Sequence, residues 1–199
     1  MASNAWLRFR YTIWAPHYDK ITKFPRERKR SVELLDLEPG ERLIIIGCGT
    51  GADLPFVPDG VRVLATDLTP AMLEQARAHA RPGIEFRVMD GLALDLPDGG
   101  FDAALLHMVL EVIPDPARCL AEAARVLKKG GRLAVFDKFL PDGARPGLLA
   151  RAGLALLDLV FTSTNRQMGE ILARSGAPFT VEHDEPSVGS YRHLLLRRL

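Results

Sequence analysis

Residues 43–53, with the sequence LIIIGCGTGAD, lead four apolar side chains directly into three glycines at alternate positions. Because glycine has no Cβ, backbone N–H groups can approach a ligand closely where such a strand turns into a helix. The alternative is a tight turn that binds nothing. The spacing nearly matches the dinucleotide-binding fingerprint, with Ala52 at the third small position, so NAD is one candidate ligand.

Around this stretch, apolar runs rich in β-forming residues alternate with helical patterns, which predicts an α/β fold built on a mainly parallel sheet. Most of the strand candidates are continuously apolar, as expected when helices cover both faces of a sheet. The predicted strands are residues 42–46, 61–66, 84–88, 101–107, 132–137, 179–183 and 190–196.

Helix start and stop signals lie between these strands. Thr69 and Asp115 are N-cap candidates directly before prolines, and Gly130-Gly131 is a stop signal after the second of these helices. The predicted helices are residues 25–37, 70–80, 116–129, 145–160 and 165–175. We see no repeat or linker, so we expect one domain over residues 1–199 with an arm at residues 1–24.

Composition excludes several classes of protein. With 199 residues, 47% of them hydrophobic and 26% charged, the chain can bury one substantial core. Its two cysteines, Cys48 and Cys119, are too few for a disulfide framework or a zinc site, so we expect no metal and a reducing, cytoplasmic setting. We expect no cleavable signal, and the oily run at residues 147–162 is interrupted by charges and too short to span a bilayer.

Charge is unevenly distributed along the chain. Up to Ser31 there are eight basic and two acidic residues, a balance of +6, whereas the remaining 18 basic and 23 acidic residues sum to −5. Aromatic residues are interleaved with these cations: Trp6, Phe9, Tyr11, Trp14, Tyr18 and Phe24. Such a segment suits contact with an anionic membrane surface. The alternative is a solvated helix whose aromatic rings cover the core. We expect no nucleic-acid partner.

Two aspartates follow predicted strands. Asp67 ends the second strand, VRVLATD, about 20 residues after the first glycine, where a carboxylate can accept hydrogen bonds from both hydroxyls of a ribose. The alternative is a turn aspartate that caps the next helix, although Thr69 is available for that task. Asp90, in VMDG, ends the third strand and is placed to reach an adenine edge.

With these features and the segments LPDGGFD (96–102), VIPDP (112–116) and LKKGGRL (127–133), the chain resembles class I S-adenosylmethionine-dependent methyltransferases over nearly its whole length. None of these segments is characteristic of NAD enzymes, and no Tyr-x-x-x-Lys motif is present. The resemblance implies a Rossmann-like seven-stranded sheet, mostly parallel with the last strand antiparallel. It also implies S-adenosylmethionine as cofactor and S-adenosylhomocysteine as product.

The resemblance further implies how the cofactor is held. The glycine loop would pass under its methionine part, the acid of the second strand would hold the ribose, and the acid of the third would meet the adenine amine. The implied cofactor-binding residues are Gly47, Cys48, Gly49, Gly51, Asp67, Leu68, Asp90, Gly91 and His107. Many members carry an acid two residues before the first glycine, where this chain has Ile45, so affinity is lower or another group takes that role.

Two segments narrow the resemblance. RFRYTIWAPHYD (8–19) and DEPSVGSYRHLLLRR (184–198) are similar to the small bacterial phospholipid N-methyltransferases that act on phosphatidylethanolamine, and also to the related quinone-biosynthesis C-methyltransferases. In this group the first segment is a helical lid, which would bring Tyr18 near the transferred methyl. The alternative is that Trp14 and Tyr18 simply pack on the core.

Transfer to an amine needs a neutral nucleophile, so a nearby base is expected. His107, at the end of the fourth strand, is the first candidate, and Asp137, closing the fifth, is a second group to steer an amine. Their alternatives are a packed histidine and a loop-capping carboxylate. Lys138, Arg166 and Arg192 are candidates for a substrate phosphate, unless they are merely solvated. The run at 147–162 either walls an acyl groove or is a buried helix.

The sequence therefore predicts methylation of phosphatidylethanolamine toward phosphatidylcholine, with the basic arm at the inner face of the cell membrane. One alternative is C- or O-methylation of a quinone-like or other small molecule. Another is a non-catalytic cofactor-binding module, which the missing acid at Ile45 favours.

Overall fold

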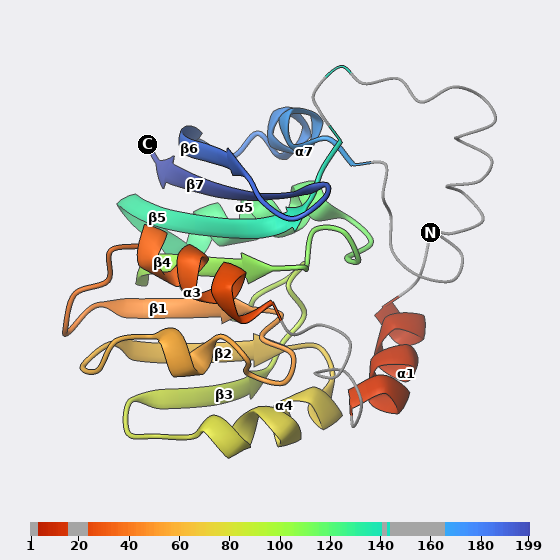
Figure 1. Cartoon of the computed structure of the whole chain (residues 1–199), viewed down its shortest axis with the longest axis vertical. Coiled ribbons are helices and arrows are strands. Elements are labelled where there is room, and N and C mark those ends of the chain that lie inside the picture. The colour runs from red at the N-terminus through yellow and green to blue at the C-terminus, as the bar shows by residue number, and fades with distance from the viewer. Residues whose placement is uncertain (1–3, 16–23, 141–142, 144–165) are drawn as a thin grey trace.

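The computed structural model describes residues 4–15, 24–140, 143 and 166–199 (Figure 1). In this part of the chain seven strands form one sheet, in the order β3-β2-β1-β4-β5-β7-β6. The strands are β1 (Arg42–Ile46), β2 (Arg62–Asp67), β3 (Ile84–Val88), β4 (Phe101–His107), β5 (Leu127–Lys138), β6 (Phe179–Pro186) and β7 (Tyr191–Arg198). The first five pair in parallel, and β7 runs antiparallel between β5 and β6. The predicted fold class is confirmed.

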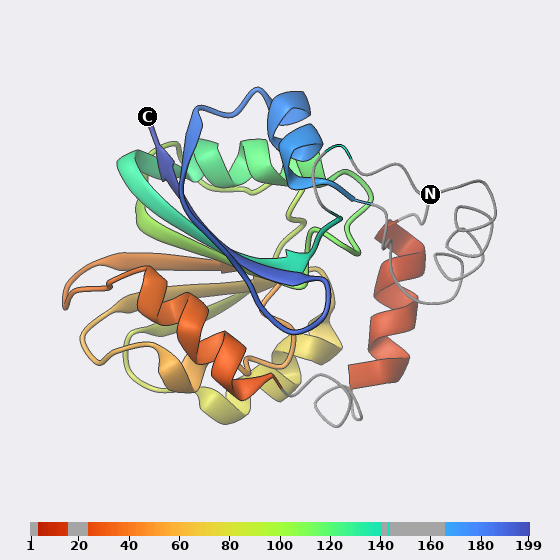
Figure 2. The same ribbon diagram turned by 45° about the horizontal axis from the view of Figure 1, so that its top comes forward.

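Helices cover both faces of the sheet, as Figure 2 shows. One face carries α3 (Pro25–Leu34) and α4 (Pro70–Ala76), and the other carries α5 (Pro116–Val126) and α7 (Met168–Ser175). Helix α1 (Asn4–Trp14) lies beyond the carboxyl ends of the parallel strands and contacts α4. Strands β2 and β3 lie on one side of β1, and β4 and β5 lie on its other side, so the strand order reverses between β1 and β4. Open α/β sheets bind ligands in the crevice at the carboxyl ends of the two strands where the order reverses.

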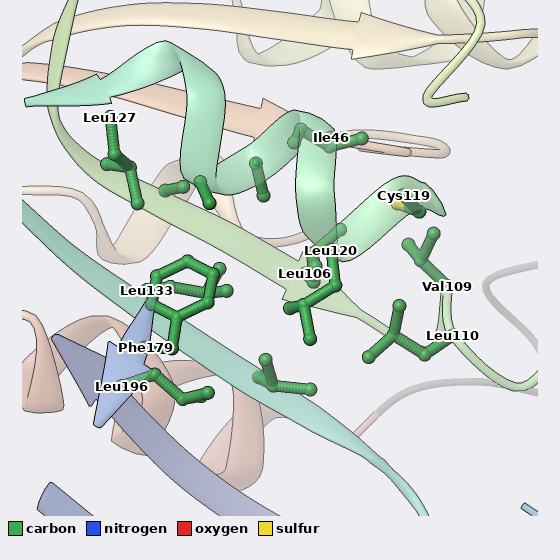
Figure 3. Close-up of a cluster of buried hydrophobic side chains, with 14 of the residues drawn as sticks. Ile46, Leu106, Val109, Leu110, Cys119, Leu120, Leu127, Leu133, Phe179 and Leu196 are labelled. Atoms are coloured by element: carbon green, nitrogen blue, oxygen red, sulfur yellow. The ribbon is translucent and has the colours of Figure 1, made fainter. Parts of the chain in front are cut away.

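Two apolar cores hold these layers together. The larger one lies between the sheet and helices α5 and α7, and Figure 3 shows Leu106 of β4 beside Leu120 of α5. The smaller one packs Val32 of α3 and Leu73 of α4 against the opposite face of the sheet. Continuous apolar strands with buried residues on both faces explain why the sequence predicts a covered parallel sheet.

Several predicted boundaries are wrong. The helix predicted over 116–129 ends at Val126, and β5 begins at Leu127 and runs through both glycines that were expected to stop the helix. Gly130 has a φ of +75°, and the pairing of β4 with β5 shifts register between Phe101 and Ala103, so the glycines serve an irregular strand start instead.

Other elements are shorter or displaced. Helix α3 ends at Leu34. The N–H groups of Leu35 and Asp36 donate to carbonyl oxygens three residues earlier instead of four, and Asp36 has a φ of +45°, which is outside the helical region. Helix α4 ends at Ala76 and continues as a 3-10 turn, η3 (Arg77–His79). A further 3-10 turn, η2 (Leu54–Phe56), follows the glycine loop. Helix α7 begins at Met168, β6 and β7 extend beyond their predicted ends, and the helix predicted at 145–160 lies outside the described residues.

The two predicted N-caps have different outcomes. Asp115 accepts a hydrogen bond from the backbone N–H of Arg118 at 3.2 Å, which confirms it as the cap of α5. Thr69 makes no capping bond to α4, and its side chain hydrogen-bonds to the Asp67 carboxyl instead. The prediction that Thr69 caps this helix is therefore wrong. As for membrane insertion, among the helices of the described ranges not one has the length and apolar character needed to cross a bilayer.

Candidate active site

A cleft opens at the carboxyl ends of the parallel strands, beneath helix α1. It contains about 690 Å³ of space not filled by protein atoms, including the part open to solvent. Its lining comes from α1, from the loops after β1, β2, β3 and β4, and from α4: Leu7, Tyr11, Ile46, Gly47, Gly49, Asp67, Leu68, Thr69, Met72, Met89, Asp90, Gly91, His107, Met108, Val109, Val112 and Ile113. This edge of the sheet is the one that the sequence indicates.

The glycine loop after β1 forms the floor of the cleft. Gly47 has a φ of +72°, and a Cβ at this position would lie only 2.7 Å from Cγ2 of Val109, so any side chain would be both strained and crowded. Gly49 donates its backbone N–H to Oδ2 of Asp67 at 2.9 Å. Gly51 does not line the cleft, and a Cβ there would press against Ala76 and Leu54 at 3.0 Å, so its role is close packing of α4.

Asp67 ties the loops after β1 and β2 together. Besides Gly49, its carboxylate accepts the backbone N–H of Thr69 at 2.8 Å through Oδ1. Burial raises the pKa of Asp67, and these backbone hydrogen bonds oppose the rise. The Thr69 side chain and the backbone of Leu68 also hydrogen-bond to this carboxylate, which lines the cleft. Asp67 is therefore both a loop-organising residue and an acceptor at the cleft wall, so the two interpretations of this residue are compatible.

Asp90 and Gly91 supply the next part of the wall. Oδ1 of Asp90 accepts the backbone N–H of Leu92 at 2.9 Å, which fixes the turn after β3. A Cβ on Gly91 would lie 3.0 Å from Ile46 and 3.3 Å from Ile113, so glycine keeps the wall thin at this point. Met72 and Met89 add apolar, adaptable surface to the same cleft.

These groups fit an adenosyl compound. Two carboxylates at neighbouring strand ends match the polar edges of a ribose and an adenine, and apolar side chains between them match the faces of the base. Of the nine residues implied for the cofactor, all but Cys48 and Gly51 line the cleft. Cys48 is buried in the smaller core, and burial raises the pKa of its thiol well above the ordinary value. Ile45 is also buried there and adds no polar group.

Helix α1 closes one side of the cleft through Leu7 and Tyr11, which are four residues apart and so lie on one face of the helix. Burial raises the pKa of the Tyr11 hydroxyl. The sequence predicts Tyr18 for this region, but Tyr18 lies outside the described residues. The four-residue spacing of Leu7 and Tyr11 could have predicted that these two side chains line the cleft. The segment contains so many other aromatic residues that this spacing does not stand out in the sequence.

His107 belongs to a buried polar group that the sequence does not predict as a unit. Its Nδ1 lies 2.5 Å from Oδ1 of Asp53, and the same oxygen lies 2.8 Å from the Arg28 guanidinium. Burial alone would raise the pKa of Asp53, but the His107 and Arg28 charges outweigh it and hold this pKa at about 2. Arg28 was counted among the eight basic residues up to Ser31, yet its side chain is only 6% exposed.

Asp137 is fully buried behind the cleft rather than in its wall. Its two oxygens accept the backbone N–H groups of Glu111 and Lys138 at 3.1 and 2.9 Å. Burial, reinforced by the Glu111 carboxylate, raises the pKa of Asp137 well above the ordinary value. This geometry is that of a loop-organising carboxyl group. Lys138 extends from the same strand end, with Nζ 3.5 Å from Oε2 of Glu111 and 5.0 Å from the centre of the Tyr191 ring.

The two candidate arginines have protein partners. Arg166 donates hydrogen bonds to the carbonyl oxygens of Leu110 and Ile113, which steadies the loop that walls the cleft. Arg192 pairs with Asp184 at 2.7 Å across the hairpin of β6 and β7. Both remain predictions as phosphate ligands. Within the described ranges, no cluster of metal-ligating side chains is present.

Comparison with known proteins agrees with this geometry. Residues 44–135 match the family described as "Methyltransferase domain". A demethylmenaquinone methyltransferase of Thermus thermophilus is 35% identical over 150 residues, which cover 69% of this chain and 68% of the relative. A phosphatidylethanolamine N-methyltransferase of Cereibacter sphaeroides is 33% identical over 138 residues, which cover 67% of this chain and 66% of the relative.

A solved structure of geranyl diphosphate methyltransferase in complex with SAM shares the fold, with a TM-score of 0.71 at 17% identity, over 87% of this chain and 84% of that chain. The chain belongs to the class I S-adenosylmethionine-dependent methyltransferases, and its cofactor is S-adenosylmethionine. Membership in this class of enzymes argues against the non-catalytic module. The chain spans about half to two thirds of the length of the curated methyltransferases that it matches.

Proposed function

We propose that this chain transfers a methyl group from S-adenosylmethionine to the head-group amine of phosphatidylethanolamine at an anionic membrane surface. The observation that carries this proposal is helix α1, because its inner side lines the cleft while its outer side exposes large apolar residues next to basic ones. The phosphatidylethanolamine N-methyltransferase relative supports the same acceptor.

The outer side of α1 suits a membrane interface. Phe9 and Ile13 are each 58% exposed, and Trp6 and Trp14 are also exposed, whereas Leu7 on the inner side is buried. The helix carries two arginines and no acidic residue. Cations beside exposed aromatic and aliphatic side chains favour anionic head groups and the polar boundary of a bilayer. An acceptor that reaches the cleft from the membrane would therefore arrive beside this helix.

When bound, S-adenosylmethionine supplies an activated methyl group, so the protein mainly aligns the acceptor and excludes water. Val109, Val112 and Ile113 give the acceptor side of the cleft an apolar wall. An ammonium has no lone pair, so the amine must first lose a proton. His107 lines the cleft, and Nε2 of its ring has no hydrogen-bond partner among the described residues. This nitrogen is the proposed proton acceptor.

The charges beside the cleft suit a zwitterionic head group. Burial disfavours the charged form of Lys138, but Glu111 and Tyr191 outweigh it and raise the pKa of Lys138, which stays cationic at neutral pH. Lys138 could thus meet the lipid phosphate, and the nearby Glu111 carboxylate the ammonium.

Methylation of a quinone-like ring is the second candidate. The demethylmenaquinone methyltransferase relative is similar over 68% of its own length, and the apolar wall after β4 suits a flat ring as well as a lipid. Both acceptors require removal of a proton, so His107 has the same role in either case.

The test is methyl transfer from labelled S-adenosylmethionine by the full chain. We expect label in lipid with vesicles of phosphatidylethanolamine and phosphatidylglycerol, and none when phosphatidylcholine replaces phosphatidylethanolamine. Label in demethylmenaquinone but not in lipid would overturn the lipid acceptor in favour of the quinone. No transfer to either acceptor would overturn both.

Membrane contact is tested by vesicle flotation of two matched variants. Phe9→Ser with Ile13→Ser removes apolar surface from α1, and we expect the vesicle-bound fraction to fall about tenfold. Val181→Ser with Val188→Ser removes similarly exposed apolar surface, 41% and 55%, from the hairpin of β6 and β7 and should leave binding unchanged. Equal losses in both variants would contradict the role of α1.

A further inference from the structure

Arg28, Asp53 and His107 come from α3, from the loop after β1 and from the end of β4, and they meet within one buried cluster. Their side chains are 6%, 2% and 1% exposed. Both Arg28 and His107 address the same oxygen, Oδ1 of Asp53. Asp53 does not line the cleft, but His107 does. Of the three residues only His107 lines the cleft, and its Nε2 is buried in the absence of a ligand.

The hydrogen bond to Asp53 decides which ring nitrogen of His107 carries the proton. An ionised carboxylate can only accept, so Nδ1 must be the donor. A neutral imidazole with a proton on Nδ1 has its lone pair on Nε2. Nε2 is the ring nitrogen that finds no hydrogen-bond partner in the described ranges. Its lone pair is therefore the polar feature of the cluster that its described neighbours leave unsatisfied.

We infer that Asp53, together with Arg28, is a positioning residue that holds His107 in the Nδ1–H tautomer and makes Nε2 the proton acceptor for the methyl acceptor. This inference rests on the proposed methyl transfer and deepens it. In the step, the N–H bond of the acceptor breaks, its electron pair stays on nitrogen, and the proton forms a bond with Nε2. The imidazolium then faces the Asp53 carboxylate until the proton leaves to solvent.

The Arg28 guanidinium prevents the Asp53 carboxylate from holding His107 permanently in its protonated, imidazolium form. A lone buried carboxylate would strongly favour the imidazolium, which can accept no proton, whereas Arg28 already balances the charge of Asp53. Two further titratable groups lie near the cluster in the described ranges: Cys48, which interacts with the Asp53 charge, and His193 on β7, which hydrogen-bonds to Ser31 at 2.9 Å and stacks on Phe136. Burial lowers the pKa of His193, so it remains neutral near pH 7.

The first test reads the tautomer directly in the full-length protein without any acceptor. Long-range proton–nitrogen NMR of the 15N-labelled chain resolves its five histidines, and His107→Gln identifies the signals that belong to His107. We expect an unprotonated Nε2 and a protonated Nδ1 at pH 8. A protonated Nε2 would overturn the inference even if methyl transfer is observed, whereas the expected tautomer without transfer would overturn only the proposed function.

The second test separates positioning from a purely structural role. Arg28→Met with Asp53→Leu replaces the ion pair by apolar side chains and removes the partner of Nδ1. We expect the single-turnover transfer rate to fall about 10²- to 10⁴-fold while S-adenosylmethionine affinity, measured by calorimetry, changes less than about twofold. Asp53→Asn keeps an oxygen that can accept the Nδ1–H of His107. This variant should retain the tautomer and a transfer rate between those of the original chain and the double variant. A double variant that transfers methyl at the original rate would overturn the inference.

A third readout comes from the pH profile. Arg28→Met alone leaves the Asp53 carboxylate without its guanidinium partner, so the carboxylate should favour the imidazolium and the acid limb of the transfer rate should move to higher pH. Arg30→Met is the matched control, because Arg30 lies on the same helix and pairs with Glu185 while its side chain is 43% exposed. An unmoved acid limb in a folded Arg28→Met protein would contradict the role of Arg28.

Discussion

Asp53 and Asp137 are both enclosed by protein, at 1% and 0% exposure, yet their carboxyl groups behave in opposite ways. Burial would raise the pKa of either group, but Asp53 meets the charges of His107 and Arg28 and has a pKa of about 2. For Asp137, burial and the like charge of Glu111 outweigh the backbone N–H groups, so its pKa is raised well above the ordinary value. Burial acts on both groups in the same direction, and the different charges of their neighbours explain why the two pKa values differ.

The largest expected effect is on the Asp53 side of this comparison. Asp53→Ala leaves the Arg28 guanidinium buried without its carboxylate, and we expect the free energy of unfolding to fall by about 3–5 kcal/mol. Glu185→Ala is the control, because it strips Arg30 of a similar bond at 2.7 Å in a more exposed place and should cost at most about 1 kcal/mol. Urea unfolding measures both. Similar losses of stability in the two variants would contradict the larger contribution of the buried Arg28–Asp53 pair.

Protonation of Asp53 at low pH should lower the free energy of unfolding by less than the Asp53→Ala substitution does. Its pKa is about 2 in the folded protein and 3.8 ordinarily, so the unfolded chain binds more protons between these values. Stability from this group is complete above about pH 4 and is lost as the pH falls toward 2, by about 2 kcal/mol. Unfolding measured across this range should show that loss, and it should be absent in Asp53→Asn. An equally steep acid loss in the variant would refute the assignment.

Asp137 should show the opposite sign. Its raised pKa means that the folded protein holds the proton more tightly, so its contribution to stability decreases as the pH rises above the ordinary carboxyl range. Asp137→Asn loses one acceptor for a backbone N–H group and should destabilise the protein by about 1 kcal/mol at pH 5. The difference should shrink at pH 8. Denaturant unfolding at the two pH values would contradict this if the difference grew instead.

The sheet and much of the cofactor cleft could be predicted because their signals are local. The glycine loop, Asp67 and Asp90 each directly follow an apolar strand, and parallel strands bring their carboxyl ends to one edge. The end of α5 was missed because Gly130-Gly131 is an ordinary helix stop, and only pairing with β4 turns it into part of a strand. Local patterns cannot show that competition.

The cluster of Arg28, Asp53 and His107 could not be predicted for a related reason. Asp53 lies 25 residues from Arg28 and 54 residues from His107, so no sequence spacing links the three side chains. Arg28 looked like one more cation of a basic segment, and Asp53 like a polar residue after a glycine loop. Only the packing of α3 against β4 and η2 brings them together.

The central claim is that the cleft binds S-adenosylmethionine with its ribose on Asp67. Isothermal titration calorimetry of the full chain with this compound tests it most directly, with Asp67→Ala and the distant, exposed Asp59→Ala as paired variants. We predict saturable heat at one site, an affinity at least about 100-fold weaker in Asp67→Ala through loss of two hydrogen bonds to a charged group, and no change in Asp59→Ala. Absence of binding heat, or equal affinity in Asp67→Ala, would contradict the claim.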